Sequence, residues 1–250
     1  MTEGRGTGLA ADPWATLRGL THARIGLGRT GDALAGREVR ALQAAHAAAR
    51  RAVHATLDPA RFALGEPFIE VKSRAPDRGV FVRRPDLGRR LRAQDAARLP
   101  HAPCDVVFVI ADGLSALAAA RQAPGVLEAV RAALPEWTIG PVIVAHNARV
   151  ALGDEIGALI SASCVVMMIG ERPGLSAADS LSLYLTWDPR IGRMDSERNC
   201  LSNIHAHGGM NHDEAAFRLA GLLRGARALG RSGVALKDDS MSARLPPATP

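Results

Sequence analysis

The charged pair Glu171–Arg172 follows a short apolar stretch, Cys164–Ile169, and comes directly before a Pro-Gly turn. This order predicts a buried strand that ends just before the pair. In an open α/β sheet, ligands bind in the crevice beyond the carboxyl ends of the strands, so both charges are candidate ligand contacts. A structural ion pair is the alternative, because paired charges also occur in purely structural networks.

Acidic residues at Asp112, Asp154 and Glu155 could in principle bind a divalent metal. Such a site would need several oxygens to converge, and the sequence does not indicate that they do. We expect Asp112 to cap a helix instead, and Asp154 and Glu155 to form a surface pair in the first turn of a helix.

Histidines gather in a Gly-rich stretch that has no carboxylate or thiol at a metal-ligand spacing. They are His205, His207 and His212, with His146 elsewhere. A solvated loop is the favoured interpretation. Since the chain also has no G-x-S-x-G elbow, we assign no catalytic residue and no metal ligand.

Cys200 lies among hydrogen-bonding residues, with Asn199 before it and Ser202 and Asn203 after it. A lone cysteine is usually a small buried apolar residue. A ring of amides and hydroxyls would also suit a ligand rich in carboxamides. The three cysteines of the chain are odd in number and far apart, so we expect them to be reduced.

The segment Gly26–Gly31 spells the dinucleotide-binding pattern G-x-G-x-x-G. That pattern works when a buried strand precedes it and an acidic residue follows about 20 positions later. Residues 22–25 are not such a strand, and residues 44–54 contain no acid. We therefore do not expect a nicotinamide or flavin site here.

The composition is that of a globular protein of 250 residues with a formal charge of +6. The cations are scattered arginines, and aromatic residues for base stacking are scarce, which disfavours nucleic-acid binding. No apolar run resembles a secretory signal or a membrane span, so we expect a soluble, cytoplasmic protein.

The alternation of strands and helices predicts an α/β fold with a Rossmann-like parallel sheet and flanking helices, preceded by a helical and irregular N-terminal region. We expect strands at 104–113, 141–145, 165–169 and 181–187, and helices at 39–57, from 115, at 126–134, 151–160 and 213–229. Residues 62–103 are expected to be irregular. The expected divisions are a flexible segment 1–20, a helical and extended region 21–99, a Rossmann-like domain 100–238 and a flexible tail 239–250.

Six stretches in order resemble the small subunit of ethanolamine ammonia-lyase. They are 23–29 (ARIGLGR), 109–116 (VIADGLSA), 148–157 (ARVALGDEIG), 170–176 (GERPGLS), 198–204 (RNCLSNI) and 232–237 (SGVALK). Each stretch alone is a weak signal, but so many in one order make a chance similarity very unlikely.

The resemblance implies a complex with a larger, barrel-shaped subunit, with adenosylcobalamin between the two chains. In that family the complex converts ethanolamine to acetaldehyde and ammonia by radical chemistry, and the large subunit holds most of the substrate site. The family positions that contact cobalamin correspond to Val150, Glu171 and Cys200 here. The resemblance also leaves a bacterial microcompartment open as a location.

Two other classes of protein remain as alternatives. A stand-alone nucleotide-binding or scaffolding module with the same core would bind a nucleotide without any large subunit. A nucleic-acid-binding protein would show a steep dependence of affinity on salt.

Overall fold

The computed structural model describes residues 12–21, 23–62 and 64–240. The outer parts of the expected flexible segments, up to residue 11 and from residue 241, lie outside the described residues. The chain divides into two compact units, Met1–Ala47 and Ala48–Pro250. Within the described ranges, no helix is both long enough and apolar enough to cross a bilayer.

The first unit contains short elements and the start of a long helix. These are α1 (Ala15–Gly19), β1 (Arg29–Thr30), β2 (Ala33–Leu34) and α2 (Gly36–His54), which continues into the second unit. Gly26 and Gly31 adopt left-handed backbone conformations, with φ of +56° and +62°. The G-x-G-x-x-G segment thus leads into a two-residue antiparallel hairpin and not into a strand-to-helix turn.

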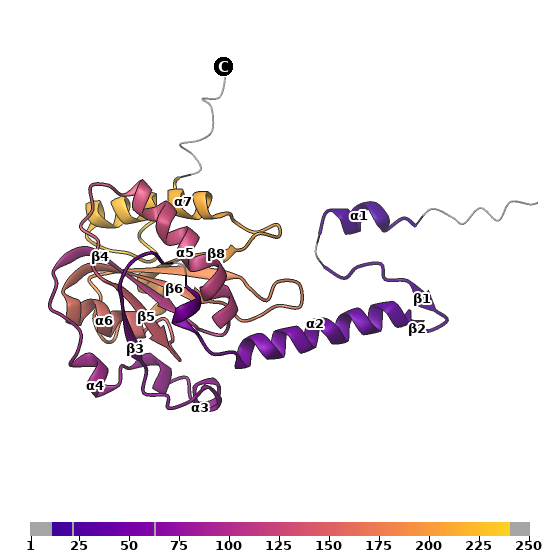
Figure 1. Cartoon of the computed structure of the whole chain (residues 1–250). Helices are drawn as coiled ribbons and strands as arrows, with labels where there is room; N and C mark the ends of the chain where they lie inside the picture. The colour runs from indigo at the N-terminus through magenta and orange to yellow at the C-terminus, as the bar shows by residue number, and fades with distance from the viewer. Residues whose placement is uncertain (1–11, 22, 63, 241–250) are drawn as a thin grey trace, which may run out of the picture. The chain divides into compact units, whose positions relative to one another are not determined.

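The second unit is built on a six-stranded sheet in the order β3-β5-β4-β6-β7-β8 (Figure 1). The strands are β3 (Phe68–Lys72), β4 (Cys104–Ala111), β5 (Val142–His146), β6 (Ala162–Gly170), β7 (Leu181–Trp187) and β8 (Arg198–Ile204). The first four in the spatial order are parallel, and β7 and β8 add an antiparallel edge. The α/β fold with a sheet and flanking helices is therefore confirmed, with two antiparallel strands added to its parallel part.

Helices cover both faces of this sheet. On one face lie α5 (Ala116–Ala133) and α7 (His212–Leu229), and on the other lies α6 (Leu152–Ile160) (Figure 1). Side chains of β4 alternate between the two cores: Phe108 faces α5 and α7, whereas Val107 and Val109 face α6. Because residues 106–111 of β4 are all buried, this part of the strand is continuously apolar.

The region 62–103, expected to be irregular, supplies strand β3 as well as the short helices α3 (Arg78–Arg83) and α4 (Ala93–Ala96) and the 3₁₀ turn at Leu87–Arg89. Its prolines lie outside the strand, so they interrupt the region without preventing a five-residue strand. Strand β8 was also not predicted from the sequence, because its polar residues obscure the alternation of apolar and polar residues that is typical of a strand.

Two expected helices, one from Ser115 and one from Val126, are a single helix, α5. Pro124 lies inside it, at a position where proline normally removes a hydrogen bond. The helix continues because Ala123 and Val126 on either side are fully buried in the core. The start of α7 packs closely against Gly125, because a Cβ on this glycine would lie 2.7 Å from a ring carbon of His212.

Candidate functional site

A cavity of about 470 Å³ opens at the carboxyl edge of the parallel strands, and it contains all three residues that the sequence singled out. Val150, Glu171 and Cys200 come from the segment before α6, the end of β6 and strand β8. The other lining residues are Gly113, Leu114, Arg149, Ile169, Gly170, Arg172, Ser182, Tyr184 and Ser202. The antiparallel strands β7 and β8 thus form one wall of the crevice expected for an α/β sheet.

Val150 lies half-buried in the turn that leads into α6. Its carbonyl accepts the Gly153 amide at 3.0 Å, next to the bond from the Leu152 amide to the Arg149 carbonyl at 2.9 Å. The preceding residue anchors this turn, because the Arg149 guanidinium stacks 4.4 Å from the Phe81 ring centroid and the Arg149 amide donates to Gly88 O at 2.9 Å. The isopropyl group is therefore presented to the cavity from a fixed backbone.

The Glu171 carboxylate is held by the hydroxyl groups of two serines, one in β7 and one just before β7. The Ser180 hydroxyl donates to Glu171 Oε2 at 2.7 Å, and the Ser182 hydroxyl donates to Oε1. The backbone amide of Glu171 donates to the Ser180 carbonyl at 2.9 Å. Its carboxylate therefore takes its hydrogen bonds from serines, and the structural ion pair with Arg172, which also lines the cavity, is not the arrangement found.

Cys200 is exposed and lies opposite Tyr184 across the β7–β8 pair. Desolvation by the cavity wall raises the pKa of the Cys200 thiol, and hydrogen bonding with Tyr184 and Ser182 offsets part of that effect. Burial and the neighbouring Cys200 raise the pKa of Tyr184 to about 12. At neutral pH the cavity therefore presents a thiol and a phenol, both uncharged, and no thiolate nucleophile.

Two glycines shape the floor of the cavity where the ends of β4 and β6 meet. Gly113 has a φ of +51°, and a Cβ on it would collide with the Gly170 carbonyl. A Cβ on Gly170 would collide with the Ser115 carbonyl and lie 2.7 Å from the Asp112 carbonyl. The Gly170 carbonyl in turn accepts the Leu114 amide at 2.9 Å. The position of Glu171 thus depends on close backbone contacts at Gly113 and Gly170, which leave no room for a side chain on either glycine.

The expectation that Asp112 caps a helix is wrong. Ser115 caps α5 instead, and its hydroxyl accepts the Ala118 amide at 3.2 Å. The buried Asp112 carboxylate accepts the amides of Asn147 and Ala148 at 2.8 and 3.0 Å, and Arg78 at 3.1 Å. Burial raises the pKa of Asp112. This residue ties the end of β4 to the turn after β5, because those turn amides have no strand partner.

Asp154 and Glu155 lie in the first turn of α6 as expected, but the expectation that they form a surface pair is wrong. Asp154 is buried and forms a two-point ion pair with Arg198, with distances of 2.6 and 2.7 Å. Glu155 accepts the Leu91 amide at 2.9 Å and pairs with Arg90 at 3.1 Å. Both acids therefore bind groups from other segments, Asp154 at the start of β8 and Glu155 in the segment after α3.

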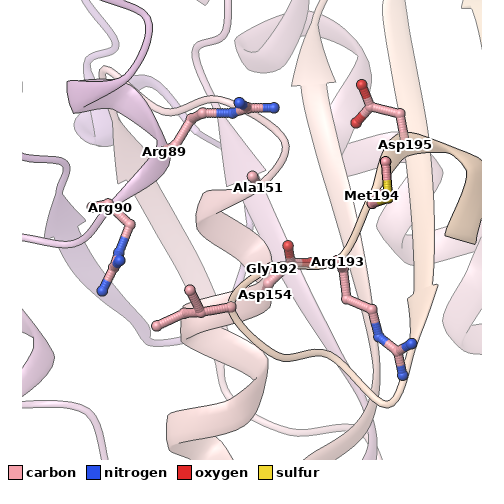
Figure 2. Close-up of a pocket in the computed structure, with 9 residues that line it drawn as sticks. Arg89, Arg90, Ala151, Asp154, Gly192, Arg193, Met194 and Asp195 are labelled. Carbon is pink, nitrogen blue, oxygen red and sulfur yellow. The ribbon is translucent and has the colours of Figure 1, made fainter.

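A second cavity, of about 380 Å³, adjoins this pair (Figure 2). Its lining includes Arg89, Arg90, Ala151, Asp154 and Arg193, with Ile191, Gly192, Met194 and Asp195. Figure 2 shows Arg90 and Arg193 pointing away from each other. Their charges already have partners in Glu155 and, for Arg193, in Asp188 and Glu197. This cavity is therefore a less suitable ligand site than the one around Glu171.

The ring of amides expected around Cys200 is only partly present. Ser202 lines the cavity, but the Asn199 amide is used to hold the C-terminal segment through Gly233 and Leu236. The Asn203 side chain contacts the His205 ring at 2.9 Å. His205 itself is buried, so the histidine stretch is not wholly the solvated loop that we expected.

Ser182 and Tyr184 are site residues that the sequence analysis missed. They alternate with Leu181, Leu183 and Leu185 along β7. In a half-buried strand such alternation places the polar residues on one face. This period-two pattern was the signal that could have identified them.

Comparisons with known proteins agree on one family. Residues 11–237 match the family described as "Ethanolamine ammonia-lyase light chain (EutC)". Proteins named "Ethanolamine ammonia-lyase small subunit" from Bradyrhizobium diazoefficiens and Rhodococcus erythropolis are 49% and 46% identical to the chain. The alignments cover 91% of both chains in the first case, and 92% of this chain and 91% of the relative in the second. A protein of the same name from Xanthomonas campestris is 46% identical over 92% of this chain and 89% of its own. The chain therefore belongs to the ethanolamine ammonia-lyase small-subunit family.

Proposed function

We propose that this chain binds one edge of adenosylcobalamin at its interface with a large catalytic subunit, in a complex that converts ethanolamine to acetaldehyde and ammonia. When bound, adenosylcobalamin supplies the radical chemistry. The observation that carries the proposal is that Val150, Glu171 and Cys200, from three separate parts of the chain, line one cavity.

The chemistry of the cavity suits a corrin edge. Val150 offers an apolar surface to the macrocycle, and Glu171 offers a carboxylate acceptor to the N–H groups of corrin amide side chains. Cys200 offers a compact, polarisable contact in its uncharged form. Together these groups can bind and orient a large amide-bearing ligand without donating or removing a proton.

The size of the cavity supports a second subunit. A volume of about 470 Å³ is within the range for a drug-sized ligand, and a cobalamin is considerably larger. An open cavity of this size would hold one edge of such a cofactor, and the rest would need another surface. The large subunit supplies that surface in our proposal and also holds ethanolamine.

Reconstitution tests the proposed function. The purified chain alone should show no ammonia-lyase activity, and activity should appear when it is mixed with the large subunit and adenosylcobalamin. Activity of this chain alone, or normal turnover by the large subunit without it, would contradict the proposal.

The proposed contact is tested by Glu171→Gln in the two-subunit complex. The substitution exchanges a charged acceptor for a neutral one, so the dissociation constant for cobalamin should rise about tenfold. Turnover at saturating cofactor should change less, because Glu171 binds and does not react. Cofactor affinity equal to that of the unmodified complex would argue against the contact.

A further inference from the structure

The Glu171 carboxylate receives a third hydrogen bond, from the neighbouring strand. The backbone amide of Asn203 in β8 donates to Oε1 at 3.3 Å. Together with the Ser180 and Ser182 hydroxyls, it brings three donors to one half-buried carboxylate. The donors come from two strands and one loop, so the arrangement depends on how β7 and β8 pair.

The pairing of β7 with β8 contains a bulge at this point. Leu181 lies opposite Ile204 and Leu183 lies opposite Leu201, so Ser182 alone faces two residues, Ser202 and Asn203. A bulge of this kind re-aims backbone groups and is common beside functional sites.

Asn203 carries the strain of the bulge, with a φ of +64°. Asparagine tolerates this left-handed conformation better than most residues with a Cβ, but it remains uncommon. The Asn203 carbonyl accepts the Met210 amide at 2.8 Å, and the Asn203 amide, on the other side of the same residue, donates to Glu171. Strained backbone of this kind persists where the surrounding structure holds it, and function is the usual reason.

The three donors occupy different numbers of acceptor positions on the two carboxylate oxygens of Glu171. A carboxylate oxygen has two acceptor positions. Ser182 and Asn203 occupy both positions of Oε1, whereas Ser180 occupies one position of Oε2. A ligand therefore finds one acceptor position, on Oε2.

We propose that Ser182, Ser180 and the bulge residue Asn203 are positioning residues, which fix Glu171 so that Oε2 accepts a single N–H of a corrin carboxamide. This inference rests on the proposed function of the cavity. A glutamate side chain that is fixed in advance loses less conformational freedom when the ligand binds. The donors should therefore matter more for cofactor affinity than for the stability of the fold.

The test compares Ser182→Ala with Ser163→Ala in the two-subunit complex. Ser163 is exposed and lies at the opposite end of β6 from Glu171, so it is a matched control. Spectroscopic titration with hydroxocobalamin should give a dissociation constant raised about three- to tenfold for Ser182→Ala. The control should bind as the unmodified complex does.

A second pair of variants keeps the test valid if Ser182→Ala does not fold. Asn203→Gly and Asn203→Val both lose the side-chain contact with His205 and both keep the backbone amide. Glycine accepts the left-handed conformation and a β-branched residue does not. Asn203→Gly should therefore bind hydroxocobalamin at least threefold more tightly than Asn203→Val.

The possible failures can be distinguished by including Glu171→Gln and by measuring Tm. If Glu171→Gln weakens binding but Ser182→Ala and Asn203→Val do not, the positioning role is wrong and the proposed contact stands. If Ser182→Ala lowers Tm without changing affinity, its role is structural and the inference is overturned. If Glu171→Gln binds normally, the proposed contact itself has failed.

Discussion

The substitution Gly170→Ala should damage both the fold and the cavity, because the space beside Gly170 is filled by backbone. A Cβ would collide with the Ser115 carbonyl and lie 2.7 Å from the Asp112 carbonyl. Backbone atoms cannot move away by changing a rotamer, so the turn after β4 must separate from the end of β6. That movement would also break the hydrogen bond from the Leu114 amide to the Gly170 carbonyl.

Two effects add up to the expected magnitude. Overpacking of a tight site costs about 1–3 kcal/mol, and the lost hydrogen bond costs about 1 kcal/mol. The free energy of unfolding should therefore fall by about 2–4 kcal/mol, which corresponds to a decrease in Tm of roughly 4–16 °C for a chain of this size. Cobalamin affinity should fall as well, since Glu171 follows directly.

The matched control is Gly174→Ala in the loop after Glu171. A Cβ on Gly174 would meet its nearest atom, the Ala177 carbonyl oxygen, at 3.4 Å, so the neighbour need hardly move. Urea unfolding followed by circular dichroism measures both variants. If Gly170→Ala costs no more than Gly174→Ala, the close approach of the two strand ends is not a constraint and our reasoning is refuted.

Three further predictions concern other groups. Asp154→Ala should lower the free energy of unfolding by about 3–5 kcal/mol, because it removes the buried partner of Arg198 and leaves that charge only the exposed Asp195 at 3.6 Å; a urea midpoint near that of the unmodified chain would contradict this. Tyr184 is the only tyrosine in the sequence, so the ultraviolet absorbance of tyrosinate reports on it alone. Its pKa of about 12 exceeds the unfolded value near 10, so the folded state keeps a proton that the unfolded state loses, and stability should fall as pH rises from about 10 to 12. Titration of the folded chain near pH 10 would show that the phenol is not buried. Iodoacetamide should modify the exposed Cys200 before the buried Cys164, and bound cobalamin should protect Cys200; equal rates with and without cofactor would place the cofactor elsewhere.

Strands β4, β5 and β6 of the parallel sheet were predictable from sequence because they are buried on both faces, whereas the half-exposed edge strand β3 was not. Runs such as 106–111 and 165–169 are continuously apolar, which few other structures explain. Strand β8 gave no such signal. Its residues Asn199 and Asn203 are polar because they bond to other segments, so they break the alternation expected for a strand.

The acidic residues show a different limit of sequence analysis. Asp112 has the spacing of a helix cap and Asp154 lies in the first turn of α6, but the carboxylates of both bind distant groups. Arg78 and Arg198, their partners, lie 34 and 44 residues away in sequence. No local pattern encodes such a pair. The three cofactor candidates were identified from motifs of the family, and only the folded chain brings them to one cavity.

The charges of the chain also bear on how the proposed function would divide work between two subunits. The buried ion pair Asp154–Arg198 is satisfied within the chain, and the carboxylate of Glu171 is fixed by serines. Cys200 and Tyr184 have pKa values raised away from neutrality, so neither is positioned to exchange protons at neutral pH. General acid–base catalysis is most effective when the pKa of the group lies near the working pH. A cavity built in this way can hold and orient a large amide-bearing ligand, and in the proposed function the large subunit supplies the proton transfers and the substrate contacts.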